Sequence, residues 1–168
     1  MRIAGIMRES IVDGPGVRFV VFAQGCLRAC PGCHNPDTWN PAEGQETTVR
    51  AIVKELRKSP GSVKGLTISG GEPFLQAGEF AELARRAHDM GLDVVTYTGY
   101  VYEDLLEMAA PDPDIARLLR ESDVLVDGPY VEPLKDIRLR FRGSGNQRVI
   151  DLRSSRQKGA TVLLKDES

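Results

Sequence analysis

The sequence predicts an α/β fold: an open partial (β/α) barrel of about five or six mostly parallel strands. Short apolar segments rich in β-branched residues alternate along the chain with segments whose apolar residues have helical spacing. The predicted strands near positions 65, 93 and 124 begin about thirty residues apart, the length of one β-α-β unit. Such repeats build a parallel sheet with right-handed crossovers. With 168 residues the chain is too short for a closed eight-stranded barrel, which takes about 250, so a small doubly wound sheet is the alternative.

Six segments have the composition of strands. Residues 18–23 are apolar, β-branched and aromatic without alternation, which is the pattern of a strand buried on both faces. The other candidate strands are 66–68, 93–97, 124–126, 147–151 and 160–164.

Four segments have the apolar spacing of amphipathic helices. In the first, Val49, Ile52, Val53 and Leu56 fall at i, i+3, i+4 and i+7, after Thr47 or Thr48 as the candidate N-cap. The others lie around residues 80–87, 101–109 and 115–119. Gly91 is placed to end the second helix, because glycine adopts the left-handed conformation at a helix end without a steric penalty.

Unusual loops follow the carboxyl ends of the first four predicted strands. They are residues 24–46, 69–76, 98–100 and 127–136. Parallel α/β folds bind their ligands at this edge of the sheet. We therefore expect the functional site among these loops.

Composition and charge exclude several classes of protein. The 22 Lys and Arg residues nearly balance the 24 Asp and Glu residues, so the net charge is −2, unlike that of proteins that coat nucleic acid. The longest apolar run, residues 19–23, is far shorter than the roughly 20 residues that cross a membrane, and the first residues lack the apolar core of a signal peptide. We expect a cytoplasmic protein that binds no nucleic acid and no membrane, in which residues 1–168 form a single domain.

Charge is distributed unevenly along the chain. Residues 135–158 contain eight Lys or Arg and two Asp, a net charge of +6, whereas residues 103–134 contain nine Asp or Glu and two Arg, a net charge of −7. Such runs are commonly solvated faces. The sharper hypothesis is that the basic C-terminal segment 135–158 docks a partner or an anion.

All three cysteines, Cys26, Cys30 and Cys33, lie in one loop, residues 24–36. Clustered thiols in a reducing compartment are usually metal ligands or redox groups. Structural zinc needs a fourth ligand, and His34 beside Cys33 gives poor tetrahedral geometry. The segment from Cys30 to His34 also fits a haem-attachment motif, and Cys30 with Cys33 could form a redox dithiol, but both interpretations leave Cys26 without a role.

An iron–sulfur cluster would use all three thiols. A four-iron cluster is normally held by four thiolates, so three cysteines leave one iron with an open coordination position. Open positions are typical of catalytic metal sites, where a substrate or cosubstrate completes the coordination. An electron carrier, which would need a fourth thiolate, and a zinc-bound interaction module are the alternatives from other functional classes.

The spacing C-x-x-x-C-x-x-C directly after a first buried strand resembles the signature of the radical S-adenosylmethionine (SAM) enzymes. The segments Asp13-Gly14-Pro15-Gly16-Val17-Arg18 and Cys33-His34-Asn35-Pro36 are similar to those of activating enzymes for glycyl-radical enzymes. Residues 97–100, 124–129 and 142–148 resemble one branch in particular, the activators of anaerobic ribonucleoside-triphosphate reductases. The resemblance runs from about residue 3 to about residue 152.

The resemblance implies a SAM site built around the cluster. Cys26, Cys30 and Cys33 would hold a [4Fe-4S] cluster. The turn Ser69-Gly70-Gly71-Glu72-Pro73 resembles the one that binds the amino group of SAM, with the glycines leaving backbone groups free for the ligand. The implied cofactor-binding residues are Gly32, Cys33, His34, Gly70, Gly71, Glu72 and Asp127. No side chain is assigned as a catalytic acid or base.

One residue departs from the family pattern. Many radical SAM proteins carry an aromatic residue just before the last cysteine, against the adenine, and here Gly32 stands at that position. Adenine must therefore be held by the backbone or by other side chains.

The resemblance also implies an activity and partners. A protein of this kind cleaves SAM reductively and generates a glycyl radical on its target. The expected partners are the glycyl-radical subunit of an anaerobic ribonucleoside-triphosphate reductase and a low-potential electron donor such as flavodoxin. The alternative is an activase of another glycyl-radical enzyme, such as pyruvate formate-lyase.

Overall fold

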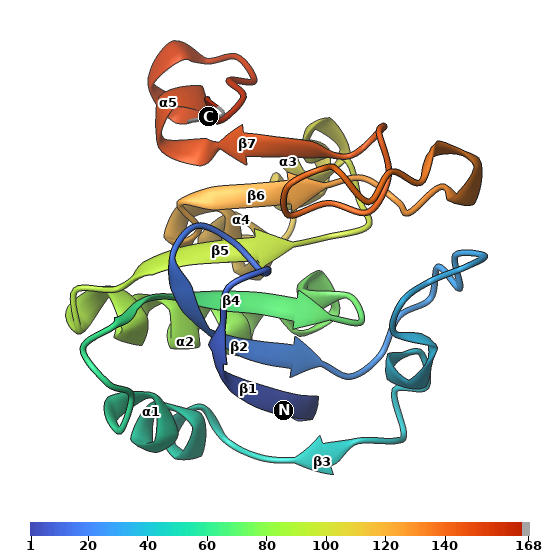
Figure 1. Cartoon of the computed structure of the whole chain (residues 1–168). Helices are drawn as coiled ribbons and strands as arrows, with labels where there is room; N and C mark the ends of the chain where they lie inside the picture. The colour runs from blue at the N-terminus through green and yellow to red at the C-terminus, as the bar shows by residue number, and fades with distance from the viewer. Residues whose placement is uncertain (166–168) are drawn as a thin grey trace.

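A single mixed sheet of seven strands runs through the computed structural model, which describes residues 1–165. Residues 166–168 of the predicted domain lie outside the described residues. The strands are β1 (Arg2–Ser10), β2 (Val17–Ala23), β3 (Gln45–Glu46), β4 (Val63–Gly70), β5 (Asp93–Tyr97), β6 (Val124–Asp127) and β7 (Arg148–Asp151). Their order is β3-β1-β2-β4-β5-β6-β7 (Figure 1). The central strands β2, β4, β5 and β6 are parallel, and the flanking strands β1, β3 and β7 pair antiparallel.

Helices cover one face of the sheet, except the last one, which lies beside β7 at the edge (Figure 1). They are α1 (Val49–Arg57), α2 (Ala77–Asp89), α3 (Tyr102–Ala109), α4 (Pro113–Glu121) and α5 (Leu152–Lys158), with 3-10 turns at η1 (Pro36–Thr38), η2 (Pro73–Gln76) and η3 (Glu132–Leu134). The core between sheet and helices contains strand residues such as Val21 and Ile68 and helix residues such as Phe80 and Leu118. No helix within residues 1–165 is long and apolar enough to cross a membrane.

The opposite face of the sheet is crossed by the loop between β1 and β2 (Figure 1). Arg18, at the start of β2, is fully buried beneath this loop and forms an ion pair with Asp93. Its Nε donates to Thr67 Oγ1 at 3.1 Å, and Thr67 Oγ1 donates in turn to the carbonyl oxygen of Asp13 at 2.7 Å. The buried cation and its hydroxyl partner therefore fix the loop in place above the sheet.

The predicted α/β class is confirmed, and five of the six predicted strands are present as β2, β4, β5, β6 and β7. The sixth, residues 160–164, is not a strand, since only Leu163 forms an isolated bridge, to Ile150. The sheet also contains seven strands instead of the predicted five or six, and fewer of them are parallel, because the sequence pattern missed the antiparallel strands β1 and β3. Most of β1 is exposed or half-buried and carries no continuous apolar run, and β3 is two exposed residues. The curvature of a partial barrel stays a prediction.

The four predicted helices are present as α1 to α4. Thr48 caps α1, accepting a hydrogen bond from Ala51 N at 3.1 Å, and Gly91 follows α2 with a φ of +78°. The sequence pattern missed α5, because Leu152 and Ser155 are its only buried residues.

Candidate functional site

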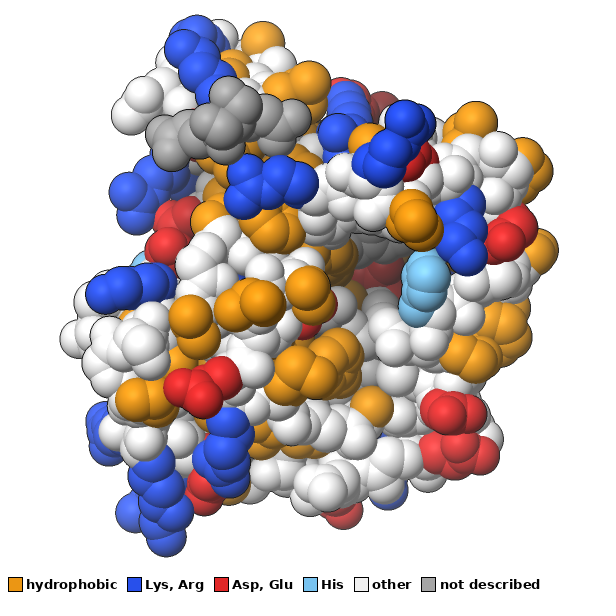
Figure 2. Space-filling view, viewed as in Figure 1, with side chains coloured by type: hydrophobic (Ala, Val, Ile, Leu, Met, Phe, Trp, Pro, Cys, Tyr) orange, Lys and Arg blue, Asp and Glu red, His pale blue; other side chains and the backbone are white. Residues whose placement is uncertain are grey.

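A cavity of about 680 Å³ opens beside the carboxyl ends of the parallel strands. Figure 2 shows this face of the molecule hollowed, with a histidine at the edge of the hollow. The walls come from the β1–β2 loop, the cysteine loop, the turn after β4, residues 97–99 after β5, Gly128 and Tyr130 after β6, and residues 137–147. This is the edge of the sheet at which the sequence predicted the site.

Hydrogen bonds close the cysteine loop at its base. Gly25 N donates to the carbonyl oxygen of Thr38 at 2.6 Å, and Cys26 N donates to that of Trp39 at 3.0 Å. The Gln24 side chain adds bonds to the carbonyl oxygens of residues 37 and 40. The loop that carries the thiols is therefore held in the fold by its own backbone.

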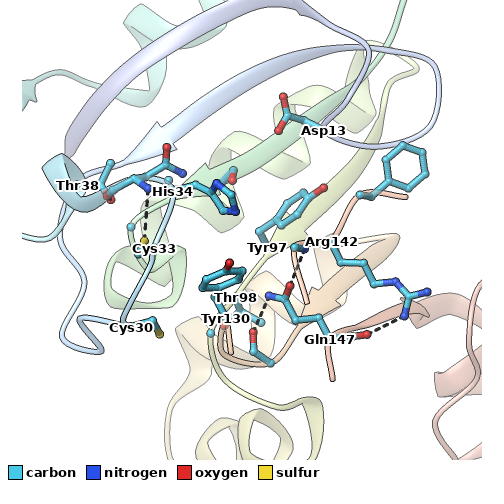
Figure 3. Close-up of a pocket in the computed structure, with 18 of the residues that line it drawn as sticks. Asp13, Cys30, Cys33, His34, Thr38, Tyr97, Thr98, Tyr130, Arg142 and Gln147 are labelled. Atoms are coloured by element: carbon cyan, nitrogen blue, oxygen red, sulfur yellow. Dashed lines mark hydrogen bonds between the residues drawn. The ribbon is translucent and has the colours of Figure 1, made fainter. Parts of the chain in front are cut away.

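All three cysteines are free, half-buried and part of the cavity wall. Cys33 N donates to the carbonyl oxygen of Cys30 at 3.0 Å, which forms a tight turn between these two residues. Asn35 N lies 3.4 Å from Cys33 Sγ and donates to it (Figure 3). Burial raises the pKa of the Cys26 thiol, and bonds from the backbone of Arg28 and Ala29 offset part of that effect. Coordination to a metal would deprotonate such thiols.

This donor set fits an iron–sulfur cluster. Three thiols and no fourth suit a cluster with one iron open to a further ligand. Within residues 1–165 no three His, Cys, Asp or Glu side chains are arranged to hold one metal ion. A cluster is wider than one ion, and each thiolate binds a different iron. An iron–sulfur cluster therefore does not require the three thiols to converge on one ion.

The turn after β4 is bonded to the start of the cysteine loop. Gly71 N donates to the carbonyl oxygen of Ala23 at 2.8 Å, and Glu72 N donates to that of Gly25 at 2.7 Å. An amino group would bind carbonyl oxygens rather than these N–H groups, so the predicted ligand contact of the turn stays a prediction. A Cβ on Gly70 would lie 2.6 Å from the oxygen of Ala23, and one on Gly71 would collide with Gly25. The two glycines thus let the turn pack directly against the start of the cysteine loop, and both also line the cavity.

Glu72 lines the cavity and is 2 % exposed. Its carboxylate accepts hydrogen bonds from Phe74 N (3.1 Å), Thr98 Oγ1 (2.9 Å) and Gly99 N (2.8 Å). Burial raises the pKa of Glu72 in spite of these bonds. The carboxylate therefore ties the end of β4 to the end of β5, whatever it contributes to a ligand.

Two of the predicted cofactor-binding residues lie outside the cavity wall as the described residues form it. Asp127 is 1 % exposed, accepts from Tyr102 N at 2.8 Å and pairs with Arg148, so it joins β6 to α3 and β7. Gly32, with a φ of +76°, faces Tyr130 and Glu132. Cys33, His34, Gly70, Gly71 and Glu72 do line the cavity.

The cavity also contains residues that the sequence did not single out as a site. They are Asp13, Tyr97, Tyr130, Phe141, Arg142 and Gln147, most of which Figure 3 labels. Gln147 closes the turn before β7, because its Oε1 accepts from Gly143 N at 2.9 Å and its Nε2 donates to the oxygen of Gly128 at 3.0 Å. The resemblance to a known family was the only signal for segments 97–100 and 142–148, because neither contains a metal-binding or catalytic motif.

Comparisons with known proteins match most of this chain to proteins that bind iron–sulfur clusters or activate a reductase, as their names state. A family model described as a 4Fe-4S single cluster domain matches residues 12–150. The chain is 37 % identical over 150 residues to the anaerobic ribonucleoside-triphosphate reductase-activating protein of Escherichia coli K12, covering 85 % of this chain and 94 % of that protein. It is 38 % identical over 145 residues to the protein of that name from Enterobacteria phage T4, covering 82 % of this chain and 86 % of the phage protein.

A second kind of relative matches a shorter part of the chain. The pyruvate formate-lyase-activating enzyme of Clostridium pasteurianum is 42 % identical over 112 residues, which is 64 % of this chain and 47 % of that enzyme.

Proposed function

Since the chain belongs to the family of the anaerobic ribonucleoside-triphosphate reductase-activating proteins, we propose that it is a radical SAM enzyme that generates a glycyl radical on such a reductase. The observation that carries the proposal is the cavity at the carboxyl ends of the strands, with three thiols and no fourth in its wall. A cavity of about 680 Å³ is in the range that encloses a cofactor-sized ligand.

Cys26, Cys30 and Cys33 would hold the [4Fe-4S] cluster, and the iron without a thiolate would accept the amino and carboxylate groups of SAM. When bound, the cluster supplies the electron that splits SAM, so that a hydrogen atom can be taken from a glycine of the partner. The protein's own part is positional. Gly70 and Gly71 hold the cysteine loop against β4, and Glu72 fixes the ends of β4 and β5 beside it. The enclosing loops keep the reactants close together and limit the access of water.

The partner's glycine must enter through the mouth of this cavity. Ile11, Val12 and Ile137 line the cavity and are 76 %, 69 % and 90 % exposed. Large apolar side chains exposed around a concave site are typical of a protein-binding surface. We therefore place the docking site of the reductase's glycine-bearing segment at this mouth, and a low-potential donor such as flavodoxin would reduce the cluster.

Cluster assembly and radical transfer test the proposal together. After anaerobic reconstitution the protein should contain four irons and four sulfides, release 5′-deoxyadenosine from SAM, and produce a glycyl radical on purified reductase, seen by electron paramagnetic resonance. Cys26→Ala, Cys30→Ala and Cys33→Ala should each abolish all three results, because no spare cysteine exists. Leu106→Ala, a half-exposed residue on α3, is the control. Full SAM cleavage by any cysteine variant would contradict the assignment.

The match to a pyruvate formate-lyase-activating enzyme supports one other target. The same resonance experiment with purified pyruvate formate-lyase distinguishes the two. A glycyl radical on the lyase and none on the reductase would show that the lyase is the partner, and the proposed cleavage of SAM would still hold.

A further inference from the structure

Tyr130, in the loop after β6, sits where three loops of the cavity wall converge. A Cβ placed on Gly32 would lie 3.2 Å from Tyr130 Cε1, and one placed on Gly143 would lie 3.1 Å from Cδ2 and Cε2 of the same ring. Both approaches are tighter than ordinary van der Waals contact. A Cβ on Gly32 would collide first with the Glu132 carboxylate, so the two glycines leave room for the Tyr130 ring together with the carboxylate that its hydroxyl binds.

The ring of Tyr130 is paired with the residue that follows the last cysteine. Its centroid lies 5.2 Å from that of His34, with the ring planes at 67°, an edge-to-face arrangement (Figure 3). Both rings line the cavity, next to Cys33. The Tyr130 hydroxyl donates to Glu132 Oε2 at 2.6 Å, and this bond raises the pKa of Tyr130 to about 12.

On the basis of the proposed function, we propose that Tyr130, with His34 at its edge, is the stacking surface for the purine ring of SAM. The methionine end of SAM is polar and belongs at the thiols, so its purine needs an apolar face a short distance along the same wall. Tyr130 and His34 offer such a face directly beside Cys33. The sequence left open what holds the adenine where Gly32 stands, and the proposed answer is an aromatic ring from another loop that packs beside Gly32.

The other aromatic residues of the wall have different surroundings, and within residues 1–165 none of them forms a ring contact with His34. The ring of Tyr97 lies at the end of β5, where burial raises the pKa of its hydroxyl, and Asp13 adds to the effect. Phe141 carries the guanidinium of Arg140 at 4.8 Å from its centroid. Trp39 lies at the base of the cysteine loop, where its carbonyl accepts from Cys26 N.

Two variants of one residue test the inference by equilibrium dialysis of radiolabelled SAM against the cluster-loaded protein. Tyr130→Leu removes the stacking face and should weaken SAM binding about tenfold or more, in the range measured for loss of an aromatic ring beneath a base. Tyr130→Phe keeps the ring, loses only the bond to Glu132, and should bind SAM within about twofold of the unaltered protein. Visible absorbance checks that both variants carry the full cluster.

5′-Deoxyadenosine, which has the purine but no methionine, is the second probe. Its affinity should fall in Tyr130→Leu by the same factor as that of SAM, whereas a ring that merely props the loop would change the two ligands unequally. Equal SAM binding by Tyr130→Leu and the unaltered protein would overturn this inference alone. Absence of SAM binding by the unaltered, cluster-loaded protein would overturn the proposed function as well.

Discussion

The two halves of the basic segment 135–158 have different surroundings in the fold. Residues 135–147 form a loop without helix or strand that lines the cavity and exposes Ile137 at its mouth. Residues 148–158 form β7 and α5 at the edge of the sheet, and none of them lines the cavity. The first half of this basic segment thus forms part of the cavity wall, and the second half forms the edge of the sheet.

Two of the four basic side chains of the second half form ion pairs within the chain. Arg148 pairs with Asp127 and Glu103, and Arg153 Nε lies 2.8 Å from Asp123 Oδ1. All three carboxylates belong to the acidic segment 103–134. The two oppositely charged segments therefore bind each other at the edge formed by β6 and β7.

The comparison shows that a run of basic residues in a sequence can serve two purposes. Its side chains can bind another protein, or they can form ion pairs with acidic residues of the same chain. The hypothesis of a docking surface stays a prediction, and residues 135–147 support it best because they line the cavity and Ile137 there is 90 % exposed. Arg138 in that loop is paired locally with Asp136 at 2.9 Å. We accordingly expect partner recognition at the mouth to depend more on apolar contact than on salt.

The largest effect should come from breaking the ion pairs at the edge. Arg148→Met leaves Asp127, which is 1 % exposed, without its cation, and should destabilise the fold by about 3 kcal/mol. For a chain of this length that lowers Tm by about 6–12 °C in a thermal melt followed by circular dichroism. The matched control is Arg138→Met, whose side chain is 87 % exposed, with an expected change below about 1 kcal/mol. Equal decreases in Tm for Arg148→Met and Arg138→Met would contradict the structural difference between the two halves of the basic segment.

A smaller effect should come from the mouth. Ile137→Ser removes a large apolar side chain from the proposed docking surface and should slow glycyl-radical formation on the reductase about fivefold, as expected for loss of roughly 1 kcal/mol of apolar contact. Production of 5′-deoxyadenosine without the reductase should be unchanged. Leu163→Ser, at a residue 56 % exposed near β7, is the control and should alter neither quantity. A decrease that disappears at high salt would assign recognition to charge instead.

Sequence patterns located the central fold and the thiols well, because both depend on local signals. The strands of the parallel core are continuous apolar runs, and three cysteines in one loop leave few chemistries. The strand β1 and the helix α5 escaped because each buries few residues, so neither has a strong apolar pattern of its own.

The remainder of the site depended on contacts that no local pattern contains. Asp127 follows a strand as a ligand-binding residue would, yet Arg148 and Tyr102 N occupy it. Gly71 is needed for contact with the protein's own backbone at Gly25. Tyr130 lines the cavity beside Gly32 and Gly143, on two other loops, where a side chain would crowd its ring or the Glu132 carboxylate. These are relations between segments, and they become visible only once the chain is folded.

The smallest effect is a pH dependence at the same edge. The ring nitrogens of His88, on α2, lie 3.0 Å from Glu121 Oε2 and 2.8 Å from Asp123 Oδ2, and Asp123 also binds Arg153. Burial alone would lower the pKa of His88, but the hydrogen bonds to Asp123 and Glu121 outweigh it, and the pKa is raised above 6.5. A group whose pKa is raised on folding stabilises the fold fully below its unfolded pKa, and that contribution is lost as pH rises through the folded pKa.

The unaltered protein should therefore exceed His88→Gln in stability at pH 6 by up to about 1 kcal/mol, and the difference should shrink by pH 8.5. Thermal melts of both proteins across this range measure it, and Arg153→Gln in the same series tests the coupling through Asp123. Without Arg153 the carboxylate of Asp123 interacts more fully with protonated His88, so the pH-dependent difference should persist to higher pH. A difference between the unaltered protein and His88→Gln that is constant from pH 6 to 8.5 would show that His88 contributes packing alone, and that its contact with Asp123 adds no pH dependence beside Arg153 of the second half.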